Sequence, residues 1–192
     1  GWYYHPEEDD KVKSLEKLID IYFNSVGLNS SLLLNIPVDK RGLIHENDAK
    51  NMLELGRFLK TTFSNNLIKE SKITYNDNNH SDNKLTDKNI NTFCAFKSKK
   101  NNVITISFPK LKEADVFTIS ENINLGQRIK EFKLEVKLKD KWVLIEEGTT
   151  IGTKRLIKFD PIEFQYLRFT IINSKDIPLI SEIGLYKSPE LK

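Results

Sequence analysis

The sequence predicts an incomplete α/β domain with the order helix, strand, helix, followed by an all-β antiparallel sandwich. Three observations lead to this fold class. Over the first sixty or so residues, apolar side chains recur every three or four positions; between two such stretches lies one short apolar run, Leu32–Ile36; and beyond residue 83 apolar and polar residues alternate. The first pattern indicates amphipathic helices, the second a strand buried on both faces, and the third strands with one solvated face.

The first predicted helix covers residues 9–26. Pro6 and the four acidic residues after it suit a helix start, because proline is tolerated in the first turn and negative charge is favourable at the positive end of the helix dipole. Gly27 suits the position just beyond the helix end. The apolar side chains that would line one face are Val12, Leu15, Ile19, Tyr22, Phe23 and Val26.

The run Leu32–Ile36 is predicted to be a strand of a parallel sheet, because an unbroken apolar run suits burial beneath helices on both faces. Pro37 closes it, and a second helical stripe follows. Helix, strand, helix is the order of an α/β barrel, but one strand cannot form such a sheet. We therefore expect residues 1–66 to be the remnant of a barrel whose other elements precede Gly1. The second stripe consists of Ala49, Met52, Leu53, Leu55 and Leu59.

A polar stretch over residues 75–83 is predicted to be a loop, and the apolar period changes to two after it. Short alternating strands separated by turn residues are typical of an antiparallel sandwich. The turn residues are Asp140-Lys141, Gly148, Asp160-Pro161 and Asn173-Ser174, and the expected strands are 103–108, 132–138, 142–145, 155–159 and 166–172. We place the sandwich in residues 67–192.

Composition argues against several classes of function. The 30 basic and 27 acidic residues leave a formal charge of +3, and the basic cluster Lys97–Lys100 lacks base-stacking aromatic neighbours, so nucleic acid is not an expected partner. The single cysteine, Cys94, excludes an intramolecular disulfide and a thiolate zinc cage. His5, His45 and His80 are too scattered to suggest a metal-dependent hydrolase. No apolar run approaches the roughly 18 residues of a membrane span, so none is expected.

Motifs in the first sixty residues, in order, resemble the end of the catalytic domain of the α-L-fucosidase family: Gly1–Asp9, Ser25–Gly27 with Asn29, Leu32–Pro37 and Asp39–Leu43. Val38 departs from the family pattern, which has a second proline there. The remainder resembles the galactose-binding-like jelly-roll sandwich, also called the discoidin or coagulation-factor type C fold, that is often attached to these enzymes. Its matching stretches are 85–93, 121–129, Trp142, 148–152 with Arg155, 167–169 and 180–186.

The resemblance implies a retaining exo-glycosidase that removes terminal α-L-fucose from glycans with an aspartate nucleophile and a general acid/base. In this family both carboxylates precede the segment corresponding to Gly1–Tyr4. No catalytic residue is therefore expected in this chain, which we predict to be inactive alone. The implied partners are a fucosylated glycan substrate and the remainder of the barrel. Export to the periplasm or the cell exterior is implied as well, although no signal peptide is visible.

Trp2 is the candidate substrate-binding residue. It would lie near the C-terminal end of the penultimate barrel strand, where barrel enzymes build their sites. Its indole could pack on the apolar face and methyl group of fucose, or simply fill the barrel mouth. Asn35 could orient a site group or hold the loop after the last strand. The acidic residues Glu7–Asp10 are interpreted as a solvated helix start.

In the sandwich, the loop Asp87–Thr92 could bind a structural Ca²⁺ through oxygen ligands, or its own turn hydrogen bonds could hold it. No other cofactor or metal is expected. Glu121 and Arg128 are predicted to form an ion pair. Trp142 and Cys94 are predicted to lie in the core.

Two other hypotheses compete with the hydrolase fragment. A free-standing carbohydrate-binding module would hold galactose-like sugars in the sandwich loops, and the only suitable cluster is Tyr75 with residues 78–80. A structural clamp on the barrel would need no ligand. Sugar binding by residues 70–192 alone would favour the module over the clamp.

Overall fold

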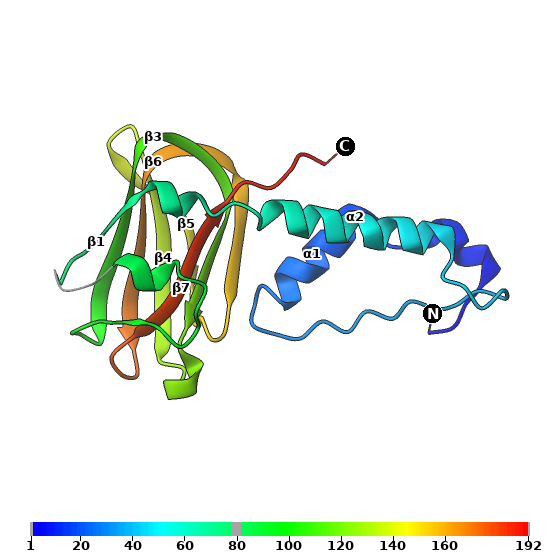
Figure 1. Ribbon diagram of the computed structural model, residues 1–192, viewed down its shortest axis with the longest axis horizontal. Helices are drawn as coiled ribbons and strands as arrows, with labels where there is room; N and C mark the ends of the chain where they lie inside the picture. Colours follow the sequence, from blue (N-terminus) through cyan, green and yellow to red (C-terminus); the bar gives the residue numbers. More distant parts are fainter. Residues whose placement is uncertain (1, 78–81, 192) are drawn as a thin grey trace.

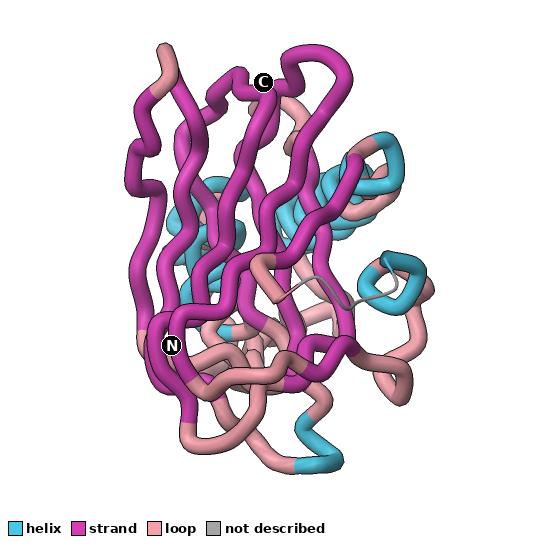
Figure 2. The backbone as a smooth tube through the Cα atoms, turned by 90° about the vertical axis from the view of Figure 1, so that its left-hand side faces the viewer, coloured by secondary structure: helices cyan, strands magenta, loops and turns pink. Residues whose placement is uncertain are grey.

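The computed structural model describes residues 2–77 and 82–191. It places an elongated helical part beside an antiparallel β-sandwich (Figure 1). In Figure 2, viewed from the sandwich end, the helices lie behind the strands. The elements are a 3₁₀ turn (Pro6–Lys11), α1 (Leu15–Ser25), α2 (Glu46–Thr62), β1 (Lys72–Tyr75), β2 (Cys94–Ala95), β3 (Lys100–Glu121), β4 (Ile129–Leu138), β5 (Lys141–Gly148), β6 (Arg155–Ser174) and β7 (Leu179–Tyr186), with short 3₁₀ turns at Leu67–Glu70, Asp82–Leu85 and Ile123–Leu125.

The helix predicted over residues 9–26 forms in two pieces. The acidic stretch is a 3₁₀ turn, and α1 begins only after Ser14, whose Oγ accepts the Lys17 N–H at 3.3 Å and caps the helix. The predicted end is close to the observed one, and the Gly27 N–H donates to the Tyr22 carbonyl at 3.1 Å. A Cβ on Gly27 would lie 2.1 Å from the Phe23 carbonyl oxygen, so only glycine fits there.

The strand predicted at residues 32–36 is not formed within the described chain. These residues run as an extended, unpaired segment along α2 (Figure 1). A strand needs a neighbour to accept and donate its backbone hydrogen bonds, and the described part of the chain brings none to this segment. Leu33 is 89% exposed, so the burial on both faces that the prediction assumed is not achieved either.

The antiparallel sandwich is confirmed. Its strands follow the order β2-β7-β3-β6-β4-β5, with β1 also paired to β3, and each pairing is antiparallel. β6 continues through Asp160-Pro161, where the sequence predicted a break. The proline is accommodated because the β3–β6 register shifts between Ala114 and Val116, and a proline without an N–H is tolerated at such an irregularity.

The sequence patterns missed β1, β2, β7 and the second half of β3. β7 carries buried residues at nearly every position, so it lacks the alternation by which the other strands were identified. The hairpin between β4 and β5 turns at Lys139 and Asp140, both with positive φ (47° and 66°), one residue before the predicted turn.

Two hydrophobic clusters build the core. The larger fills the sandwich, where the Phe132 and Phe169 rings stack at 5.3 Å and Phe117 continues the stack at 5.8 Å. The smaller joins the helical part to the sandwich, because Val116 and Leu156 of the strands pack with α1 and α2 residues: Leu18, Ile19, Phe23, Leu55 and Phe58. A backbone bond from the Leu156 N–H to the Gly27 carbonyl (2.9 Å) crosses the same junction.

Of the predicted core residues, Cys94 is buried, but Trp142 is not in the core. It is half-buried on the face of β5 that points away from the core, paired with Lys137, and the Arg168 guanidinium lies 4.1 Å from its ring centroid.

Within the described ranges, no helix is long and apolar enough to cross a membrane. The boundary at residue 66 stays a prediction.

Candidate functional site

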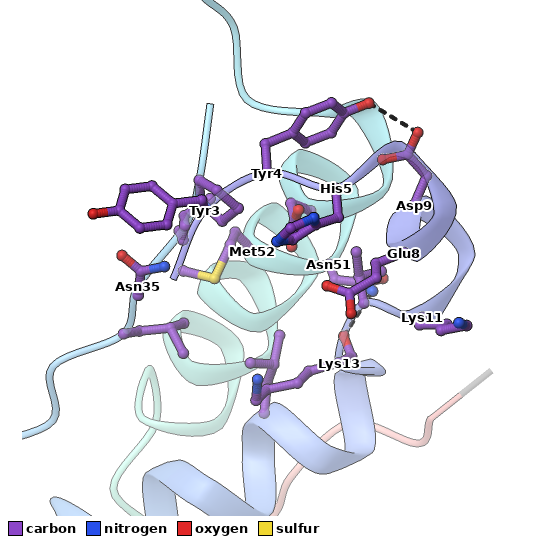
Figure 3. Close-up of a pocket in the computed structure, with 16 residues that line it drawn as sticks. Tyr3, Tyr4, His5, Glu8, Asp9, Lys11, Lys13, Asn35, Asn51 and Met52 are labelled. Carbon is purple, nitrogen blue, oxygen red and sulfur yellow. Dashed lines mark hydrogen bonds between the residues drawn. The ribbon is translucent and has the colours of Figure 1, made fainter. Parts of the chain in front are cut away.

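A pocket of about 240 Å³ is shown in Figure 3. Its lining residues belong to the end of the helical part that faces away from the sandwich, where the N-terminus lies in Figure 1. Four parts of the chain line it: the N-terminal segment within residues 3–13, Leu18 of α1, the extended segment at residues 34–37, and the first turns of α2 with Asp48, Asn51 and Met52. The pocket brings together motifs that are about thirty residues apart in the sequence. Asn35, one of the predicted site residues, lines it.

Trp2 and Asn35, the two predicted site residues, are neighbours. The Asn35 side-chain Nδ2 donates to the Trp2 carbonyl at 3.1 Å, which ties the N-terminal segment to the extended segment. Trp2 is 74% exposed, so its indole is available to a ligand rather than filling a core. Tyr3 lies beside Asn35 in Figure 3, whereas the Tyr4 ring points in the opposite direction. Whether Trp2 contacts substrate stays a prediction.

Tyr4 belongs to a polar network at the rim of this pocket. Its hydroxyl donates to Asp9 Oδ2 at 3.0 Å, and partial burial together with this carboxylate raises the pKa of Tyr4. His45 Nε2 lies 3.4 Å from the same oxygen, and its Nδ1 accepts the Asn47 N–H at 3.3 Å, capping α2. The Asn47 amide returns to the Asp9 carbonyl at 2.7 Å. Asp9 is therefore a half-buried structural acceptor, not one of the solvated charges that the sequence suggested.

Asp39 fixes the turn that follows the extended segment. Its carboxylate accepts the Arg41 and Leu43 N–H groups at 2.7 and 3.3 Å, and Arg41 Nε at 2.8 Å. The hydrogen bond from the Arg41 guanidinium lowers the pKa of Asp39. Arg41 also bonds Glu46, at the first turn of α2, at 2.9 Å. The turn is thus bound to the helix start, a positioning role for the segment that carries Asn35.

The pocket lining combines aromatic, amide and carboxylate side chains. Tyr3 and Asn35 line the pocket, whereas the exposed Trp2 indole adjoins it without lining it. Asp9, the half-buried carboxylate of the pocket, is engaged by Tyr4. His5 Nδ1 lies 3.7 Å from Oε1 of exposed Glu7.

In the sandwich, turn hydrogen bonds hold the candidate calcium loop. Asp87 accepts the Asn89 N–H at 2.8 Å and the Thr92 hydroxyl at 2.6 Å, and the latter bond lowers the pKa of Asp87. Glu182, which the sequence reasoning missed, lies beside this loop; burial, together with Asp87, raises its pKa to about 7. Groups of three or more metal-ligating side chains do not occur among the residues placed by the structure. The calcium interpretation stays a prediction.

Glu121 and Arg128 do not form the predicted ion pair. The buried Glu121 carboxylate accepts three backbone N–H groups, from Arg128 (2.8 Å), Ile129 (3.0 Å) and Gly152 (3.0 Å). The Arg128 guanidinium instead donates to the Ile177 and Leu125 carbonyls. Both side chains steady the neighbouring loop, but by bonding to backbone, which a charge-pair argument does not anticipate.

The loop cluster of the carbohydrate-binding hypothesis loses its aromatic platform. Tyr75 is 8% exposed, and its ring packs edge-on against Phe96 with centroids 6.1 Å apart. The other members, residues 78–80, lie outside the described residues. A sugar cannot stack on a ring that is already enclosed by the core.

Comparison with known proteins matches both halves of the chain. Residues 62–183 match the model of the F5/8 type C domain and residues 1–63 that of α-L-fucosidase. Alpha-L-fucosidase 1 of Arabidopsis thaliana is 33% identical over 97% of this chain and 38% of its own length. A GH29 fucosidase of Ruminococcus gnavus, a mutant solved with fucose, superposes with a TM-score of 0.90 at 34% identity, over 99% of this chain and 40% of that one. A glycoside hydrolase 29 family member from an unknown rumen bacterium gives 0.82 at 34%, over 100% and 32%. The chain thus spans well under half the length of these relatives.

Proposed function

Because this chain belongs to the α-L-fucosidase family, with an F5/8 type C domain over residues 62–183, we propose that it is the C-terminal part of a retaining exo-α-L-fucosidase. The parent protein would hydrolyse terminal α-L-fucose from glycans. The chain itself supplies the last part of the catalytic domain and the sandwich, and it lacks the nucleophile and the acid/base. Alone it is inactive.

The bond between Asn35 and Trp2 is the observation that carries this proposal. It holds the N-terminal aromatic segment against the extended segment at residues 32–37, although the described chain contains no sheet in which the two could pair. Trp2, Tyr3 and Leu33 of these segments stay exposed, which fits an edge that continues into further barrel strands. The relatives that match nearly the whole of this chain are more than twice as long.

The hydrolysis of 4-nitrophenyl α-L-fucoside tests the proposal. We expect no turnover by the 192-residue chain and turnover by a longer protein that carries the preceding part of the gene. Retention of anomeric configuration, followed by NMR of the released sugar, tests the reaction class. Turnover by the chain alone, or a longer gene product without fucosidase activity, would contradict the proposal.

Trp2 is proposed to contact the sugar in that longer protein. Replacing Trp2 with Ala should raise KM for the fucoside by about fivefold, since stacking of an aromatic ring contributes on the order of 1 kcal/mol. Tyr166→Ala, which removes an aromatic ring on the distant β6, is the matched control. Equal effects of the two substitutions would show that Trp2 does not contact the sugar.

Export of the parent protein to the periplasm or the cell exterior belongs to the same proposal, and cell fractionation tests it.

A further inference from the structure

A groove of about 590 Å³ lies where α1 meets the strands β5 and β6. It lies apart from the N-terminal pocket, and the two share no lining residue. Its size is within the roughly 300–1,000 Å³ of small-molecule sites. We propose that this groove binds a neutral sugar unit of a glycan.

One wall of the groove is apolar. Phe159 and Ile145 are half-buried, and Leu28 is 44% exposed although it lies at the junction between the helical part and the sandwich. The ring edge or face of Phe159 offers the kind of surface on which the C–H face of a pyranose packs. The wall is fixed in place, because Leu28 is bridged to Arg155 and Leu156 bonds to the Gly27 carbonyl.

Arg155 provides an unused donor. Its side chain is 16% exposed, its Nε is buried without a hydrogen-bond partner, and its nearest carboxylate oxygen, on Glu146, lies 3.9 Å from Nη2. The guanidinium is instead held over the Phe132 ring, 5.7 Å from its centroid. A buried N–H without a partner is costly, so a small shift of the guanidinium that brings Nε–H to a ligand oxygen in the groove would recover that free energy.

Other polar groups of the groove combine acceptors with donors. Asp20, Glu146 and Asp160 supply carboxylates, and Lys158 adds an ammonium group that lies 5.8 Å from the Phe23 ring centroid. On α1, the Asn24 amide donates to the Asp20 carbonyl at 2.9 Å, which leaves its Oδ1 to accept from a ligand.

The balance of charge decides the class of ligand. Three carboxylates face two cations, so neither an anion nor a cation gains a strong net attraction in the groove. A neutral polyol uses both kinds of partner, because each hydroxyl donates and accepts, and its apolar face meets the wall made by Phe159. This inference depends on the groove alone and not on the hydrolytic activity of any longer protein.

NMR titration of the ¹⁵N-labelled 192-residue chain tests the proposal. The probes are methyl α-L-fucoside, methyl β-galactoside and N-acetylglucosamine, with galacturonate and glucosamine as charged comparisons. We expect at least one neutral probe, at millimolar concentration, to shift the Arg155 Nε–H signal and the backbone amides of Asn24 and Phe159. Binding in the millimolar range is what a single exposed sugar site provides.

Phe159→Ala should weaken this binding by about tenfold or more, and Arg155→Lys, which keeps the charge but removes Nε, should weaken it similarly. Tyr166→Ala, on the same strand but outside the groove, should leave it unchanged. The melting temperature of each variant separates loss of binding from loss of fold; if Arg155→Lys unfolds the chain, the Phe159 and Asn24→Ala variants decide.

Three outcomes would overturn the proposal: no groove signal that responds to any neutral probe, shifts confined to other loops, or a clear preference for a charged probe. A fucosidase assay of the longer protein is unaffected by any of them, so failure of the groove and failure of the proposed hydrolase are distinguishable.

Discussion

Glu182 is a half-buried carboxyl group on β7 whose pKa is raised to about 7 by burial and by the neighbouring Asp87. Its ordinary pKa of 4.5 applies in the unfolded chain, so between these values the folded protein binds more protons. The stability that Glu182 contributes is therefore present below about pH 4.5 and is lost as pH rises through 7.

We accordingly expect Glu182→Gln to remove this decline. Relative to the unsubstituted chain, the variant should gain unfolding free energy between pH 4 and pH 8, by on the order of 1 kcal/mol after allowance for solvent screening. Urea denaturation at a series of pH values, with a chelator present, measures it. Parallel stability curves for the two proteins would contradict this prediction.

Repeating the series with Ca²⁺ tests the calcium interpretation, because a cation held by Asp87 and Glu182 would lower the pKa of Glu182.

Glu121 gives a second prediction at the scale of single residues. Alanine in its place would deprive the N–H groups of Arg128, Ile129 and Gly152 of their acceptor in the interior. Leaving buried donors unpaired costs about 1–3 kcal/mol each, so we expect a loss of at least about 3 kcal/mol by chemical denaturation. Glu113→Ala is the control, because its exposed pair with Lys187 is worth under about 1 kcal/mol. Similar losses for both variants would show that Glu121 does not organise its loop.

The sequence could not reveal the partners of single polar residues. Glu121 and Arg128 are neighbours, as expected, but Glu121 binds backbone N–H groups. Every residue except proline has such a group, so the sequence does not indicate which of them will bind. Trp142 was placed inside because it sits in an alternating strand, yet alternation does not say which of the two faces is the core. Glu182 gave no signal, since only folding brings β7 to the loop of Asp87.

At the scale of elements, the hairpin between β4 and β5 carries avoidable backbone strain. Lys139 and Asp140 both adopt positive φ, which side chains with a Cβ disfavour. Asp140→Gly should therefore raise the unfolding free energy by roughly 0.5–1 kcal/mol, provided that Asn replaces Lys139 to complete the favoured Asn-Gly turn. Thermal denaturation checks it, with Glu147→Gly, inside β5, as a control expected to destabilise. A drop in stability for the turn variant would contradict the argument.

Elements with their own period were predictable, and elements that depend on a partner were not. The α2 stripe and the alternating centres of β3, β4 and β6 appear where expected, since a period records which face is buried. The run at residues 32–36 has the composition of a buried strand, but the described chain offers it no pairing neighbour. The apolar composition of residues 32–36 favours a strand, but a strand forms only where a neighbouring segment pairs with it.

At the scale of the whole molecule, the helical part has two sides of different character: one packs against the sandwich and the other is exposed. The sandwich encloses its aromatic stack and is joined to the helical part through Leu156, which is buried. The far side of the helical part leaves Trp2, Tyr3 and Leu33 largely exposed. Large exposed apolar side chains on a folded protein mark a surface that another surface covers.

We therefore expect the isolated chain to self-associate through that side. Leu33→Asp should reduce self-association in sedimentation velocity without lowering the unfolding midpoint, because an 89% exposed side chain contributes little to the folded state. Leu156→Ala should do the opposite: it removes a buried contact between helices and sandwich, costs about 2–5 kcal/mol of unfolding free energy, and leaves the exposed side unchanged. A chain that remains monomeric at high concentration, with Leu33→Asp indistinguishable from it, would show that this side needs no partner, and the continuation of the barrel would lose its structural support.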